Sequence, residues 1–149
     1  MAAAGADISK ERLRFWLQLL KTSRHVENLL RERLRRDFAT TLPRFDVMAM
    51  LHKSGEGLKM SQLSGQLMVS NGNVTGIIDR LVGDGLVERV AIKGDRRATL
   101  VRLTPEGAAQ FRRMAETHER WIDEIFAPLG SDDMTCGREM LARIREETR

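Results

Sequence analysis

One helical pattern near the start of the chain constrains the fold more than any other feature. Large apolar residues recur every three or four positions from about Ile8 to Phe38, which is typical of one face of an α-helix. These positions are Leu13, Trp16, Leu17, Leu20, Val26, Leu29, Leu30, Leu34 and Phe38. Ser9 is predicted to cap the helix. Because such a length is hard to bury within one small domain, we expect a partner helix from a second copy of the chain.

Length and composition predict a single domain. The 149 residues, 42% of them hydrophobic, are enough to bury a core without disulfides or a structural metal. The single cysteine, Cys136, excludes a disulfide framework and any multi-cysteine metal site. The histidines, His25, His52 and His118, lack a ligand spacing, so we predict no metal and no cofactor.

Several functional classes are disfavoured by what the sequence lacks. It has no Ser/His/Asp order, paired-carboxylate signature, Gly-rich dinucleotide motif or P-loop, so we predict no catalytic activity and no catalytic residues. No apolar run approaches the ~20 residues that would span a bilayer. Residues 1–6 are too short and lack the basic leader of a signal peptide. We therefore expect a soluble, cytoplasmic protein with no membrane partner.

The charge is distributed unevenly. The net charge is +4, but residues 1–53 carry +5, residues 54–103 carry +2 and residues 104–149 carry −3. A basic surface favours a polyanionic partner, because lysine and arginine contacts to phosphates release condensed counterions.

Short helical patterns follow the long one. A second helix begins at Pro43 and ends near Gly55, and a third runs from its cap, Ser61, to Leu67. Met68 and Val69 form a turn, and a fourth helix starts at Ser70. Its apolar stripe consists of Val74, Ile77, Ile78 and Leu81. The helix is predicted to end at Gly83 and Gly85. Gly85 suits a left-handed stop.

The pattern then changes to that of strands. Residues 86–92 and 98–103 are rich in β-formers, and the polar loop 93–97 between them contains a glycine, which predicts a β-hairpin with a charged tip. Thr104 is expected to cap the next helix, with Pro105 in its first turn and an end near Phe126. After Pro128-Leu129-Gly130, Ser131 is expected to cap a last helix to about Glu146.

This order predicts a mainly α fold with a small β-hairpin wing, in which a winged helix-turn-helix domain is flanked by N- and C-terminal dimerisation helices. The whole chain, residues 1–149, forms one domain. Residues 40–103 form the DNA-binding module, and residues 8–38 and 104–147 form the dimerisation helices.

The fourth helix is predicted to be a recognition helix. With its apolar stripe buried, it would expose Ser70, Asn71, Gly72, Asn73, Thr75, Gly76, Asp79 and Arg80. Asparagine can hydrogen-bond an adenine edge, and threonine can contact a base or a phosphate. The free amides at the Ser70 end suit a phosphate. Glycine costs ~1 kcal/mol inside a helix, so Gly72 and Gly76 call for an explanation. Either the bare backbone lets DNA approach closely, or glycine serves packing there or is simply tolerated.

The hairpin tip is the second candidate contact. Lys93 and either Arg96 or Arg97 could reach DNA, with an arginine in the minor groove, where the negative potential is strongest. Asp95 would repel phosphate alone, so we expect it to hold a neighbouring arginine by a charge-assisted hydrogen bond.

These residues resemble a known family. The run SNGNVTGIIDRLVGDGLVERVAIKGDRRATLVRLTPEG, from Ser70 to Gly107, is similar to the MarR (multiple-antibiotic-resistance regulator) family of transcriptional regulators. The resemblance implies a homodimer with interlocking end helices. It also implies a pseudo-palindromic DNA operator and a repressor that a small ligand or oxidation releases. Carried over by position, Arg97 is the minor-groove residue and Asp95 steadies it.

The resemblance also implies an effector site. Ligand-responsive members bind aromatic carboxylates and related compounds in a cleft between the dimer helices and the winged module. Candidate lining residues here are Trp16, Arg24, His25, Arg44 and Met48. Peroxide-sensing members carry a cysteine near the start of the first helix, which this chain lacks, so we expect Cys136 to be inert.

Other functions stay open beside a repressor. An activator or a non-sensing architectural DNA binder would use the same module. A winged-helix module for protein–protein assembly would not bind duplex DNA in a salt-dependent way.

Overall fold

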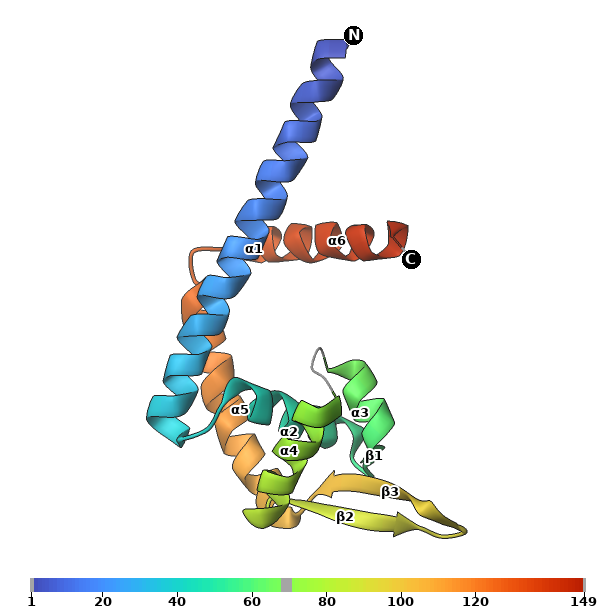
Figure 1. Cartoon of the computed structure of the whole chain (residues 1–149). Helices are drawn as coiled ribbons and strands as arrows, with labels where there is room; N and C mark the ends of the chain where they lie inside the picture. Colours follow the sequence, from blue (N-terminus) through green and yellow to red (C-terminus); the bar gives the residue numbers. More distant parts are fainter. Residues whose placement is uncertain (1, 68–70, 149) are drawn as a thin grey trace. The chain divides into compact units, whose positions relative to one another are not determined.

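A computed structural model describes residues 2–67 and 71–148, without the side chains of residues 2–6, 71, 72, 96 and 97. The fold is mainly helical with a small antiparallel sheet, as predicted (Figure 1). The elements are α1 (Ala2–Phe38), α2 (Leu42–Ser54), β1 (Leu58–Lys59), α3 (Met60–Gln66), α4 (Asn71–Gly83), β2 (Val87–Ile92), β3 (Asp95–Leu103), α5 (Pro105–Phe126) and α6 (Ser131–Glu147). The chain divides into two compact units, Met1–Glu116 and Thr117–Arg149.

Helix α1 starts earlier than predicted and is covered unevenly. It begins at Ala2 rather than near Ile8, because the small residues before Ile8 continue the helix. It ends where Ala39 takes a left-handed φ of 50°, and the Ala39 and Thr40 amides donate to the Arg35 and Leu34 carbonyls at 3.2 and 3.4 Å. Leu30 and Leu34 are buried towards this end.

The core of the first unit lies within the winged module. Helices α2, α3 and α4 bury Val47, Leu51, Leu63, Val74, Ile78 and Leu81. Pro43 lies in the first turn of α2, where its missing N–H costs nothing, and the Thr41 hydroxyl accepts from the Arg44 amide at 3.3 Å. Gly85 has the predicted left-handed conformation, with φ of 75°.

The sheet has the strand order β1-β3-β2 and is antiparallel throughout. The two-residue strand β1 was not predicted, because two residues are too short to show a period. The predicted five-residue tip is also wrong. The turn contains only Lys93 and Gly94, and Ile92 pairs with Asp95. Since Ala91 pairs with Thr99, residues 96–98 form a bulge in β3.

Three predicted helix caps are corrected and one is confirmed. Ser9 lies inside α1 rather than at its N-cap, because the helix begins at Ala2. The N-cap of α3 is Lys59 rather than Ser61, and its amide donates to Gln62 Oε1 at 2.9 Å. The N-cap of α6 is Gly130 rather than Ser131, and its amide donates to Asp133 Oδ2 at 3.0 Å. In both cases a side chain three residues later accepts from the cap amide. Thr104 caps α5 as predicted, because its hydroxyl accepts from the Gly107 amide at 3.0 Å.

The predicted turn at Met68 and Val69 and the predicted helix start at Ser70 lie outside the described residues. Among the described residues, no helix is both long and apolar enough to cross a membrane.

Candidate nucleic-acid interface and adjoining cleft

Helix α4 is anchored by an apolar stripe and carries two polar faces. Val74, Ile78 and Leu81 are fully buried where α4 packs against α2, α3 and β2. Ile77, predicted to share this stripe, is only partly buried and lines a cleft instead. The buried residues Val74, Ile78 and Leu81 are four and then three positions apart, as on one face of a helix. Ile77 lies at the edge of this face.

One polar face of α4 adjoins the hairpin. Thr75 and Asp79 are exposed there, and the Asp79 carboxylate accepts from the Arg89 guanidinium on β2. Within the hairpin, Glu88 pairs directly with Arg102, and their side chains form an ion pair at 2.7 Å. Both pairs are largely exposed, so they contribute little to stability. They do link α4 and the two strands of the hairpin by charged contacts.

The hairpin residues that are predicted to contact DNA lie nearer the turn than the Glu88–Arg102 pair. Lys93 and Asp95 are exposed at the end of the hairpin. The backbone of Arg96 and Arg97 lies in the β3 bulge, and their side chains are outside the described part of the structure. Asn71 and Gly72 form the start of α4, and Ser70 lies outside the described residues.

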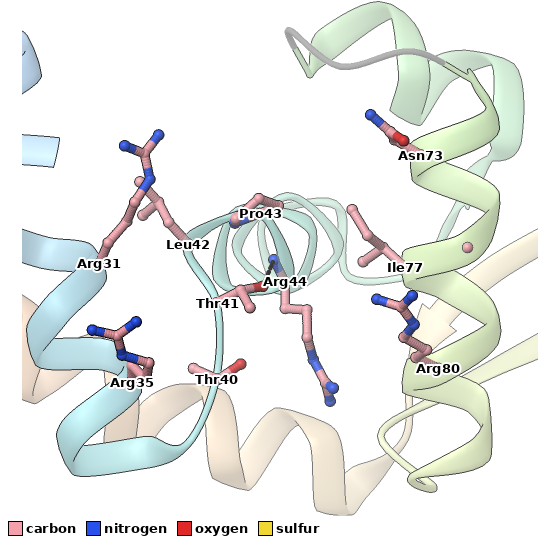
Figure 2. A pocket seen from close by; sticks show the side chains of 11 residues that line it. Arg31, Arg35, Thr40, Thr41, Leu42, Pro43, Arg44, Asn73, Ile77 and Arg80 are labelled. Carbon is pink, nitrogen blue, oxygen red and sulfur yellow. Dashed lines mark hydrogen bonds between the residues drawn. The ribbon is translucent and has the colours of Figure 1, made fainter. Parts of the chain in front are cut away.

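The other polar face of α4 lines a cleft. Asn73, Gly76 and Arg80 follow one another at three- and four-residue steps on this face, together with Ile77. Figure 2 shows this wall of α4 opposite the end of α1, with the start of α2 between them. The α4 residues that are predicted to contact DNA are therefore divided between two faces of the helix, one beside the hairpin and one beside the cleft.

The cleft has a volume of about 660 Å³ and is lined by four arginines. Arg31 and Arg35 come from α1, Arg44 from α2 and Arg80 from α4. The remaining lining residues are Thr40, Thr41, Leu42, Pro43, Asn73, Gly76 and Ile77, and none of the lining residues is acidic. This combination of positive charge and apolar surface suits a small organic anion.

Arg44 connects the cleft to the end of α4. Its Nη2 lies 2.5 Å from Asp84 Oδ2, in the turn that follows α4. Its Nε is buried and has no partner among the described residues. A buried donor without an acceptor is energetically costly, so the position of Arg44 carries an unsatisfied polar group.

The predicted effector residues are not gathered in one place. Arg44 lines the cleft, and Met48, which is buried, lies with Arg44 beside a smaller cavity of about 280 Å³. Trp16, Arg24 and His25 are exposed on α1 and do not line the cleft. All five remain predictions. Sequence reasoning missed Arg31 and Arg35, although their four-residue spacing on one helix face was available as a signal.

An acidic group adjoins the same region. Burial raises the pKa of Asp46 on α2, and repulsion from Glu27 on α1 adds to this, while Arg31 opposes it. Arg31 itself lies 3.5 Å from Glu27 and donates to Asn28 at 3.1 Å. Its charge is thus partly compensated by its own helix.

The arrangement of α2, α3 and α4 with the β2–β3 hairpin is that of a winged helix-turn-helix protein. Comparisons with known proteins agree with this class. The MarR family model matches residues 40–99. A crystal structure of a MarR family transcriptional regulator from Silicibacter pomeroyi is 31% identical, covers 96% of this chain and 99% of its own, and superimposes with a TM-score of 0.81.

Two further relatives extend the comparison. The HTH-type transcriptional regulator PecS of Dickeya dadantii is 34% identical over 68% of this chain, although the match spans only 63% of PecS. A mutant MarR from E. coli, solved in complex with operator DNA, is 25% identical over 90% of this chain and 95% of its own, with a TM-score of 0.77. The chain belongs to the MarR family and is a helix-turn-helix transcriptional regulator.

Proposed function

We propose that this regulator acts as a homodimeric repressor that binds a pseudo-palindromic operator. Helix α4 enters the major groove, and the hairpin brings Arg97, with Lys93 and Arg96, to the minor groove. A small anionic ligand in the cleft beside α4 releases the DNA.

The anchoring of α4 is the observation that supports this function best. Its buried stripe holds the helix against the module, while Asn73 and Thr75 remain exposed on it. A helix held in this way can present side chains to base edges without losing its own packing. The likeness to E. coli MarR bound to operator DNA supports the same orientation.

Dimerisation is supported by uncovered apolar side chains at both ends of the chain. Leu13, Trp16 and Leu17 of α1 are 52–57% exposed. Helix α6 exposes Met134, Met140, Leu141 and Ile144 and buries no residue within the chain. Apolar faces of this kind are covered in solution by another surface, and a second copy satisfies both.

A titration with DNA from immediately upstream of the coding sequence tests the proposal. Fluorescence anisotropy at two salt concentrations, with random duplex as competitor, should show binding that survives the competitor and weakens with salt. Binding that the competitor abolishes would argue against specific recognition of this DNA. The absence of any salt-dependent binding to duplex DNA would favour an assembly module.

Transcription measurements separate the remaining alternatives. A repressor should lower transcription from the bound promoter, and an activator should raise it. An architectural binder would respond to no ligand and would bend or coat DNA with little dependence on sequence.

A further inference from the structure

An ion pair joins helix α4 to the β2–β3 hairpin where the apolar packing of the hairpin ends. Val87 at the base of β2 is buried, and Ala91 on the same face of the strand is exposed. Arg89 lies between them on this face, and its guanidinium donates to the carboxylate of Asp79 on α4. The core therefore holds the base of the hairpin, and a charged contact to α4 follows two residues further along.

The length of the hairpin makes its tilt against α4 important. A strand rises ~3.3 Å per residue, so the turn at Lys93 lies about 20 Å from Val87. A tilt of about 10° at Val87 would move the turn by about 3 Å, which is half of the ~6 Å width of a minor groove. A contact that limits this tilt thus determines whether α4 and the hairpin fit adjacent grooves of one duplex together.

We propose that Asp79 and Arg89 are positioning residues for operator binding. Their ion pair holds the hairpin at the angle to α4 that lets both elements enter the DNA at once. This inference rests on the proposed function. It gives Asp79 a role that favours DNA binding, although its negative charge alone repels phosphate. Because the pair is largely exposed, it acts on the orientation of the hairpin and adds little to the free energy of unfolding.

The Glu88–Arg102 pair is a matched control within the same hairpin. Its side chains are exposed to a similar degree, and they pair across β2 and β3 rather than with a helix. They lie on the face of the hairpin opposite to that of Arg89, because successive residues of a strand alternate between faces. Glu88→Gln therefore removes one negative charge, as Asp79→Asn does, without loosening the hairpin from α4.

The first test compares binding to an operator and to random duplex. The operator is the upstream DNA or a sequence selected from random duplexes, and anisotropy titrations at one salt concentration give both affinities. Asp79→Asn should lower the ratio of operator to random-duplex affinity by about fivefold or more, whereas Glu88→Gln should leave it unchanged. Loss of a negative charge by itself strengthens DNA binding. A ratio that stays constant or rises for Asp79→Asn, or that falls equally in both variants, would overturn the proposal.

A double-mutant cycle separates pairing from net charge. If the ion pair acts as a unit, Arg89→Gln should weaken operator binding, and adding Asp79→Asn should cause no further loss. The double variant has the net charge of the unaltered chain, so binding as tight as that of the unaltered chain would show that only charge counts. Asp79→Glu retains a carboxylate and should keep most of the operator affinity. A loss as large as that of Asp79→Asn would contradict a role for the ion pair.

Residual dipolar couplings measured without DNA distinguish failure of this inference from failure of the proposed function. In the unaltered chain and in Glu88→Gln, the amides of β2 and β3 should report one orientation relative to α4. In Asp79→Asn they should report a changed or averaged orientation. Identical couplings in all three chains would overturn the positioning role even if the operator is bound. Changed couplings in a chain that binds no duplex specifically would overturn the proposed function, while the effect of the pair on the hairpin would stand.

Discussion

The two halves of α1 have the same apolar period but different surroundings. Towards its end, Leu30 and Leu34 are 7% and 0% exposed. Towards its start, Leu13, Trp16 and Leu17 are more than half exposed, although their spacing is the same. The comparison shows that periodicity identifies an apolar face but not what covers it. In the covered half the same chain supplies the partner, whereas at the start of α1 the proposed dimer would supply it.

The largest expected effect comes from truncating matched leucines in the two halves. Leu34→Ala should lower the free energy of unfolding by ~3–5 kcal/mol, because it leaves a cavity in a closed core. Leu17→Ala should have an effect that depends on protein concentration, because in the proposed dimer its partner lies on the other copy. Denaturant unfolding at several protein concentrations measures both. A concentration-independent loss for Leu17→Ala would contradict the comparison.

Charge placed on the uncovered half should separate the protomers. The double substitution Leu13→Glu with Leu17→Glu should raise the dimer dissociation constant by ~100-fold or more, because it buries carboxylates in an apolar contact. Sedimentation measures this, and circular dichroism should show retained helix. Gln18→Glu, at an exposed position on the opposite face of the same helix, is the control. A wild-type chain that is monomeric at micromolar concentration would remove the basis for this prediction.

Arg97 at the hairpin tip connects the two halves of α1 to DNA binding, because its contribution should depend on whether the start of α1 holds a dimer together. Arg97→Ala should weaken operator binding by ~1–3 kcal/mol at fixed salt, since a minor-groove arginine is lost. In the monomeric double variant the same substitution should cost about half as much, because one hairpin is present rather than two. Anisotropy titrations give both values. Unchanged affinity would remove Arg97 from the interface.

A glycine on the cleft face of α4 tests a local effect. A Cβ at Gly76 meets no atom within 4 Å, so close packing does not require glycine there. Gly76→Ala should therefore raise stability by up to ~1 kcal/mol, independently of protein concentration. Gly65→Ala in α3, which also faces open space, is the matched control. Operator affinity that falls only for Gly76→Ala would indicate close approach of DNA, and unchanged affinity would indicate simple tolerance.

The smallest effect concerns Asp46, which faces the covered half of α1. Because burial and Glu27 raise its pKa, the charged form of Asp46 opposes folding at neutral pH. As the pH falls through the raised pKa, protonation removes this penalty. Asp46→Asn should thus stabilise the protein at neutral pH and have progressively less effect under acid conditions. Unfolding midpoints across this pH range measure the difference, with Asp123→Asn on α5 as the control. A constant difference at every pH would contradict the assignment.

Much of the winged module could be predicted from the sequence. The stripe of Val74, Ile78 and Leu81, the glycine stop at Gly85 and the cap at Thr104 each depend on spacing or on one residue's chemistry. Local rules therefore identified helix α4 and the hairpin.

The sequence-based predictions were wrong where contacts with other residues determine the local structure. The turn at Lys93 and Gly94 is tighter than predicted because pairing of Ile92 with Asp95 continues β3 through the charged run. The strand β1 exists only because β3 lies beside it. At the helix starts, Gln62 and Asp133 accept from the cap amides, so neighbouring serines were not needed as caps.

For this protein, the sequence alone determined the order of elements, the apolar faces and the polar residues of α4, because each follows from a short-range period. Only the tertiary structure placed Arg35 and Arg80 on opposite walls of one cleft and divided the polar surface of α4 between this cleft and the hairpin. These arginines are far apart in the chain and are brought together by the packing of α2 against α1 and α4. No local pattern encodes that packing.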